Sequence, residues 1–274
     1  MACCHSNFCH GGASEHEHLL AVPAMQRMAA VEQVDIQERV SHLEAFSAMM
    51  GQEIEMANRY AITDRKTGKQ IFFGHEKTGL WRRQLQLCFG DCAPWELDLI
   101  YTEGTRRDLA FKLERPWTCS CCCCRRPRLN VIDAESGRAI GSIRDPIKCC
   151  CVAMKFEAFD DSGNRVATAS TGCGCCQCGL CCSCPCGPCS RIHLTVSGPS
   201  GKKVGRMYRQ IPGCCKWMLV PDADNYFVEF DQEMDPATKV LLMSLAIFMD
   251  YRYFNNNVLD SGRTADGFVD DAGP

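Results

Sequence analysis

The sequence predicts a mainly β protein in which about eleven or twelve antiparallel strands close into a barrel or pack as a sandwich. Two observations predict this fold class. Between residues 58 and 230, strand-like runs come in pairs that are joined by short polar turns containing glycine. After the last strand, one apolar stretch, Val240–Met249, needs partners on every side. So many antiparallel strands would expose long edges unless the sheet closed or formed two layers.

The chain begins with residues 1–30, which we expect to form a flexible arm. The following segment, Val31–Met50, places apolar residues near one helical face and predicts a helix that docks on an edge of the core. We therefore expect a flanking helix on the N-terminal side of the barrel domain, which we assign to residues 31–254.

Five hairpins are predicted next, because each pair of apolar runs flanks a short polar turn that contains Gly. The pairs are Tyr60–Thr63 with Gln70–Phe73, Leu97–Tyr101 with Leu109–Leu113, Leu129–Ile132 with Ala139–Ile143, Met154–Phe159 with Arg165–Thr168, and Ile192–Val196 with Lys203–Met207. A last strand is predicted at Asn225–Phe230.

The segment 237–254 predicts a helix that begins next to Pro236, a residue favoured at helix starts. Its apolar side chains include Val240, Leu241, Leu242, Leu245, Ile247 and Phe248. The apolar run would be about 15 Å long as a helix, whereas about 20 residues are needed to cross a bilayer. Burial in the core and insertion into a membrane both stay open here. Residues 255–274 are expected to be a disordered polar tail.

Cysteine is the compositional outlier, with 24 residues in a chain of 274. They lie next to one another in groups, a pattern unlike the separated cysteines of a disulfide scaffold. No secretory signal pattern is present at the N-terminus, so a reducing, cytosolic location is expected. The net charge of −3 gives no overall attraction to nucleic acid or to an anionic membrane, and nucleic acid is not an expected partner.

The densest short group, Cys119, Cys121, Cys122, Cys123 and Cys124, is a candidate for thioester acylation. One acyl chain gives marginal membrane residence, so adjacent acceptors allow stable anchoring with covalent palmitate. Nearby arginines, Arg115, Arg125, Arg126 and Arg128, would add attraction to an anionic leaflet. A second group, Cys173–Cys189, contains Cys-x-x-Cys spacings, so acylation, a zinc or iron–sulfur site, and unmodified thiols all remain open there.

A loop of acidic residues is a candidate for weak Ca²⁺ binding. The positions that a twelve-residue calcium loop would use are Asp222, Asp224, Tyr226, Val228, Phe230 and Glu233. Phe227 stands where such a loop needs glycine, and the alternation of Tyr226, Val228 and Phe230 also fits a strand. A calcium site and a turn that leads into a strand are both open.

Several of these stretches resemble the phospholipid scramblase family, in the same order along the chain. They are Val31–Glu55, Asn58–Tyr60 with Gly68, Phe72 and Glu76, Leu113–Pro116 followed by the cysteine run 119–124, and Pro221–Asn225 directly before the apolar helix. The family resembles the Tubby-like fold, which implies a closed barrel of twelve strands wrapped around the C-terminal helix. At Arg125–Pro127 the chain departs from the family's further cysteines.

The resemblance implies calcium-stimulated, ATP-independent movement of membrane phospholipids in both directions between leaflets, with no bond-breaking catalysis. It also implies attachment to the cytoplasmic face of the plasma membrane through acylated cysteines, with the nucleus as the alternative when they are unacylated. No phosphate-binding Gly-x-x-x-x-Gly-Lys run is present, so nucleotide is not expected to bind. The alternative function is a palmitoylated adaptor of Tubby-like fold that binds proteins, lipids or DNA.

Overall fold

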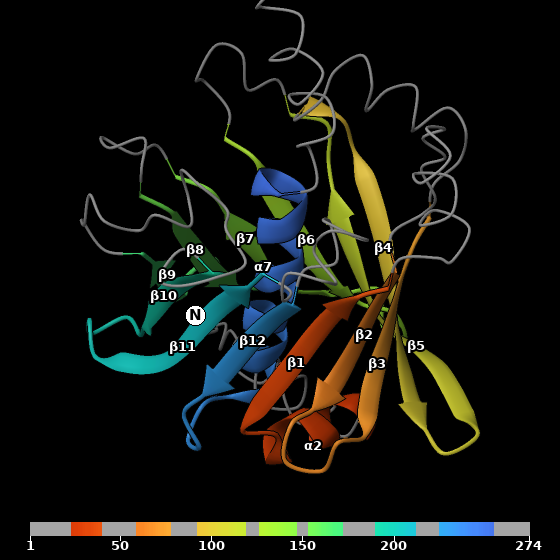
Figure 1. Ribbon diagram of the computed structural model, residues 1–274. Helices are drawn as coiled ribbons and strands as arrows, with labels where there is room; N and C mark the ends of the chain where they lie inside the picture. Colours follow the sequence, from red (N-terminus) through yellow and green to blue (C-terminus); the bar gives the residue numbers. More distant parts are fainter. Residues whose placement is uncertain are drawn as a thin grey trace, which may run out of the picture.

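The computed structural model describes residues 23–39, 59–77, 92–118, 126–146, 153–171, 190–211 and 225–254. The strands are β1 (Gln33–Glu38), β2 (Arg59–Asp64), β3 (Gln70–Glu76), β4 (Trp95–Glu103), β5 (Arg106–Arg115), β6 (Arg128–Asp133), β7 (Ala139–Arg144), β8 (Lys155–Asp160), β9 (Arg165–Ser170), β10 (Arg191–Ser197), β11 (Lys203–Gln210) and β12 (Asn225–Phe230). The helices are α2 (Pro23–Ala30) and α7 (Pro236–Tyr253). The strands form one closed barrel around α7, as Figure 1 shows, so the predicted barrel is confirmed.

Each strand pairs antiparallel with its neighbours in sequence, and β1 closes the ring by pairing with β12 as well as β2. All five predicted hairpins are present. Their turns carry glycine with positive φ, at Gly68, Gly104, Gly137, Gly163 and Gly201. A side chain with a Cβ strains in that conformation, which is why the turn chemistry locates the hairpins so well.

Alternation along the strands separates the barrel interior from its outer surface. In β4 the inward residues Trp95, Leu97, Leu99 and Tyr101 are buried, and the residues between them are partly exposed. Because side chains on a strand point to opposite faces in turn, one apolar set fills the core.

Helix α7 fills the centre of the barrel, where it packs against β7, β8, β12 and α2. Asp235 caps it by accepting a hydrogen bond from the Thr238 amide at 3.2 Å, and Pro236 opens it. The six predicted apolar side chains between Val240 and Phe248 are each at most 1% exposed. Gly141 of β7 allows close approach, because a Cβ there would lie 2.2 Å from the Phe159 carbonyl oxygen and 3.0 Å from Leu241. The structure therefore places this helix in the barrel core.

A membrane-crossing helix is not found in the described part of the chain, where no helix combines the necessary length and apolar character.

The N-terminal side differs from the prediction. Residues 33–38, which we predicted to lie in a helix beginning at Val31, form strand β1, and the flanking helix lies earlier, at Pro23–Ala30. Val34 and Ile36 alternate with polar residues and are fully buried between β2 and β12. The helix is not a flexible arm at this point, because Met25 and Met28 pack into the core. The helical periodicity was misleading, because Val34 and Ile36 also fit the two-residue alternation of a strand.

Candidate functional site

The up-and-down order gives the barrel two different ends. We call the end that carries the five hairpin turns the turn end. We call the opposite end the cysteine end. It carries the strand termini from which the segments between successive hairpins leave, and also those from which the segments after β1 and before β12 leave. All cysteines except Cys3, Cys4 and Cys9 belong to these joining segments or border them. The topology therefore attaches five separate cysteine groups to one end of the barrel.

The acylation candidates Cys119 and Cys121–Cys124 lie outside the described residues, and so does the Cys173–Cys189 group. The chain on either side of the first group is described. Trp117, two residues before it, is 47% exposed although most large apolar side chains of the barrel are buried. Trp117 was not among the residues predicted to be functional, although its position next to the cysteine run was a usable signal. Tryptophan is enriched where protein meets the membrane–water interface, because its ring is amphipathic.

A buried carboxylate organises the cysteine end between β6, β7 and the helix. Asp145 has a fully buried side chain, and its Oδ2 accepts hydrogen bonds from Arg126 at 2.9 Å and Arg252 at 3.2 Å. The Tyr253 hydroxyl donates to the same oxygen at 3.3 Å. Burial, followed by the charge of Asp145, raises the pKa of Tyr253 above its ordinary value. These contacts hold the last turn of α7 to the strand end that precedes Cys149.

A second buried carboxylate joins the helix to the strands that close the barrel. Asp250 of α7 is 2% exposed and accepts hydrogen bonds from Tyr60 of β2 and Tyr226 of β12, both at 2.6 Å. Burial is the main cause that raises the pKa of Tyr60 well above its usual range, and the nearby charge of Asp250 adds to it. Tyr226 thus has a structural partner inside the barrel.

The candidate calcium residues fall into three groups. Tyr226, Val228 and Phe230 lie on β12 with buried side chains, and β12 pairs with both β1 and β11. Glu233 lies in the turn between β12 and α7, on the exposed surface. Asp222 and Asp224 lie outside the described residues, so calcium binding by this segment stays a prediction. Within the described ranges, no three His, Cys, Asp or Glu side chains come together in a way that could hold a metal ion.

These features define a class of protein: an up-and-down β barrel that is filled by its own C-terminal helix and has its cysteine groups attached at one end. The chain belongs to the Scramblase family, whose model matches residues 15–256.

Curated relatives agree with this assignment. The chain is 23% identical to human phospholipid scramblase 1 over 85% of its length and 66% of the relative, and 25% identical to human phospholipid scramblase 2 over 85% and 70%. It is 23% identical to mouse phospholipid scramblase 1, over 85% of the chain and 64% of that relative. The match thus spans about two thirds of these relatives' length. No solved structure matches the chain.

Proposed function

We propose that the protein is a membrane-anchored phospholipid scramblase that moves phospholipids in both directions between leaflets, stimulated by Ca²⁺ and without ATP. The observation that carries this proposal is the match to the Scramblase family over residues 15–256, together with relatives named phospholipid scramblases. The activity requires no bond-breaking chemistry, so the protein acts as a lipid translocator and not as an enzyme.

The cysteine end faces the bilayer in this proposal. Palmitate on Cys119 and Cys121–Cys124 anchors the barrel, and the exposed ring of Trp117 enters the interface beside it. Each buried methylene of an acyl chain contributes about 0.8 kcal/mol, so several chains give stable residence where one would not. The anchored surface is the cytoplasmic face of the plasma membrane, and the unacylated protein is free to enter the nucleus.

Phospholipid headgroups pass along the outside of the barrel in this proposal. The interior is an unsuitable path, because the side chains of α7, such as Leu242 and Leu245, fill it and have no exposed surface. The acidic segment around Asp222 and Asp224 supplies carboxylates for a weak Ca²⁺ site. Strand β12 follows this segment directly in the chain.

A vesicle assay tests the scrambling activity. Acylated protein isolated from membranes is reconstituted into unilamellar vesicles that contain a fluorescent phospholipid, and external dithionite bleaches the label in the outer leaflet. Scrambling lets dithionite reach label from the inner leaflet as well, and the fraction bleached should rise with added Ca²⁺. Vesicles with protein that bleach no faster or further than protein-free vesicles, at every Ca²⁺ concentration, would show that the proposal is wrong.

An acylated adaptor is the second candidate function, because the apolar side chains of α7 are buried inside the barrel and are not presented to a membrane. Replacing Cys119 and Cys121–Cys124 by Ser separates the two functions when the variant is tethered artificially to vesicles. If the protein is a scramblase, the variant loses its acyl anchor but still moves lipid once it is tethered to the vesicles. If the protein is an adaptor, the tethered variant moves no lipid, and loss of the anchor only relocates it to the cytosol or nucleus. Replacing Cys214 and Cys215 by Ser is the matched control for cysteine loss at the same end.

A further inference from the structure

The segment that carries the acylation candidates Cys119 and Cys121–Cys124 is fixed to the barrel on its amino side. The amide of Thr118, the residue directly before it, donates a hydrogen bond to the carbonyl oxygen of Cys92 at 3.3 Å. The Thr118 hydroxyl donates to the carbonyl oxygen of Pro116 at 3.1 Å, and Thr118 is 6% exposed. The chain therefore enters the segment from a defined point near the start of β4.

The carboxyl side of the segment is fixed more firmly, through Arg126 and Asp145. The Arg126 guanidinium donates from Nε to the Asp145 carbonyl oxygen at 3.0 Å and from Nη2 to Asp145 Oδ2 at 2.9 Å. The Asp145 amide in turn donates to the Pro127 carbonyl oxygen at 3.1 Å. These hydrogen bonds hold residues 126 and 127 to residue 145, just beyond the end of the β6–β7 ladder, where Arg128 pairs with Arg144.

This contact changes the expected role of Arg126. From the sequence, Arg126 was predicted to add attraction to an anionic leaflet. In the structure its guanidinium is turned to Asp145, whose side chain is fully buried, and the Arg126 side chain is 28% exposed. A planar guanidinium can hold two acceptors at once, so it fixes geometry as well as supplying charge. Arg126 therefore holds the chain in place at the barrel.

Because both sides are fixed, the length of the chain limits how far the acyl groups can stand from the barrel. Cys122 is the fourth residue after Thr118 and the fourth before Arg126. An extended chain spans at most about 3.6 Å per residue, so the Cys122 backbone reaches no more than about 14 Å from either residue. Release of Arg126 and Pro127 would lengthen this reach by about 7 Å. Acyl chains in this run therefore hold the cysteine end itself against the bilayer.

The same carboxylate also receives the end of α7. Asp145 Oδ2 accepts hydrogen bonds from Arg252 at 3.2 Å and from the Tyr253 hydroxyl at 3.3 Å, both in the last turn of the helix. One oxygen atom thus joins the chain that follows the acylation segment to the helix that fills the barrel. Since a buried ion pair resists the loss of one partner strongly, we expect this chain and the helix end to move together.

We propose that Arg126 and Asp145 form a positioning pair that couples the acyl anchor to the end of α7 and so fixes which end of the barrel lies against the membrane. This inference rests on the acylation of Cys119 and Cys121–Cys124 proposed above, and it explains how one anchor can orient the whole barrel. Arg126 is the residue to replace, because Asp145 then keeps Arg252 and Tyr253 as partners and the barrel should still fold.

Energy transfer to the membrane measures this orientation. Acylated full-length protein, isolated from membranes, is bound to phosphatidylcholine vesicles that carry a rhodamine-labelled lipid. A fluorescent amino acid replaces either Arg191, which is exposed at the cysteine end, or Asp161, which is exposed at the turn end. With Arg126 in place, transfer should be clearly more efficient from residue 191 than from residue 161. Arg126→Gln should reduce this difference by half or more, because the lengthened attachment lets the barrel turn.

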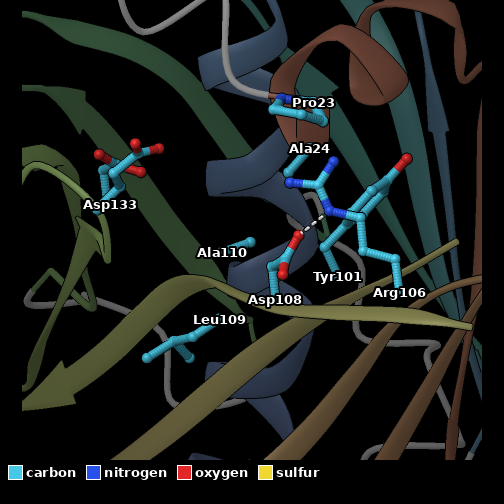
Figure 2. Close-up of a pocket in the computed structure, with 9 residues that line it drawn as sticks. Pro23, Ala24, Tyr101, Arg106, Asp108, Leu109, Ala110 and Asp133 are labelled. Atoms are coloured by element: carbon cyan, nitrogen blue, oxygen red, sulfur yellow. Dashed lines mark hydrogen bonds and ion pairs between the residues drawn. The ribbon is translucent and has the colours of Figure 1, made fainter.

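Two arginines at the turn end provide matched controls. Arg27→Gln removes a guanidinium from a similarly buried pair, in which Arg27 is 32% exposed and lies 2.7 Å from Asp64. Arg106→Gln removes a more exposed arginine, which Figure 2 shows paired with Asp108 beside a cavity of about 270 Å³. Neither variant should change the difference in transfer, because neither arginine touches the acyl anchor.

The loss of orientation in Arg126→Gln should be equal in phosphatidylcholine vesicles and in vesicles that also contain phosphatidylserine. A loss confined to the anionic vesicles would mean that Arg126 acts by attraction to the leaflet, and it would overturn the proposal. So would unchanged orientation in Arg126→Gln, or an equal loss in Arg27→Gln. Intact mass with and without hydroxylamine separates this result from failure of the anchor: absence of acyl groups would overturn both, whereas unchanged orientation of acylated Arg126→Gln overturns the positioning pair alone.

Discussion

The buried contact between Asp250 and two tyrosines should be a main support of the closed barrel. Asp250 of α7 accepts hydrogen bonds from Tyr60 and Tyr226, on the two strands that flank β1 in the ring. Because one acceptor on the central helix joins the strands on either side of β1, we expect it to stabilise barrel closure at the cysteine end. Removing it with Asp250→Ala leaves two buried hydroxyl groups without this acceptor.

The magnitude follows from these two contacts. Each hydroxyl that stays buried without a partner destabilises the fold by about 1–3 kcal/mol, so Asp250→Ala should lower the free energy of unfolding by about 2–6 kcal/mol. This is a large part of a typical total of about 5–15 kcal/mol. Tyr60→Phe removes one donor to a charged acceptor and should lower the free energy of unfolding by about 1.5–3 kcal/mol.

Urea denaturation of the wild type, the two single variants and the double variant forms a double-mutant cycle. If the contact is real, Tyr60→Phe should destabilise the Asp250→Ala background much less than the wild type, with a coupling of about 0.5–3 kcal/mol. Asp161→Ala, on the surface of a hairpin, is the control and should change the free energy of unfolding by about 0.5 kcal/mol or less. Additive single effects, or an Asp250→Ala variant as stable as the control, would refute the reasoning.

Two further predictions concern the ends of α7 and alkaline pH. Lys239 is 1% exposed and donates to the carbonyl oxygens of Ala29 and Val31 at 3.0 and 2.8 Å. Lys239→Met should therefore lower the free energy of unfolding by about 2–4 kcal/mol and speed amide hydrogen exchange in α2. Unchanged exchange in α2 would contradict this role. Because the pKa values of Tyr60 and Tyr253 are raised in the folded state, the unfolded chain loses these protons first. Stability is therefore complete below the ordinary tyrosine pKa and should fall above pH about 10, and the urea midpoint of the Tyr60→Phe/Tyr253→Phe variant should decline less steeply there than that of the wild type.

The hairpins were accessible from the sequence because each depends on local chemistry. Asp133-Ala-Glu-Ser-Gly137 contains the aspartate, the hydroxyl and the glycine that its turn needs within five residues, and the structure uses all three. The apolar run Val240–Met249 likewise required a surrounding on all sides. The residues alone left open a barrel or a sandwich, and core burial or membrane insertion of this run. The closed barrel around the helix was what the family resemblance implied, and the structure confirms it.

Strand β1 was not accessible, because its evidence lies elsewhere in the chain. Gln33–Glu38 has only Val34 and Ile36 as buried residues, too few to separate a two-residue from a helical repeat. Its identity is fixed by pairing with β2 and β12, and β12 lies about 190 residues later in the sequence. The helix α2 was missed for a related reason, since its buried methionines become core residues only when α7 lies beneath them.

The candidate site also has features that the sequence determined and features that only the structure decided. The sequence by itself determined the cysteine groups, the acidic segment and the hairpin order, and that order already implies that the cysteine groups leave from one end. Only the tertiary structure decided that Asp250 and Asp145 are buried anchors of α7, that Trp117 is exposed, and that Asp64 of the first hairpin turn pairs with Arg27 of α2. Turns are set by neighbouring residues, whereas burial and charge pairing depend on side chains that the fold brings together from distant positions.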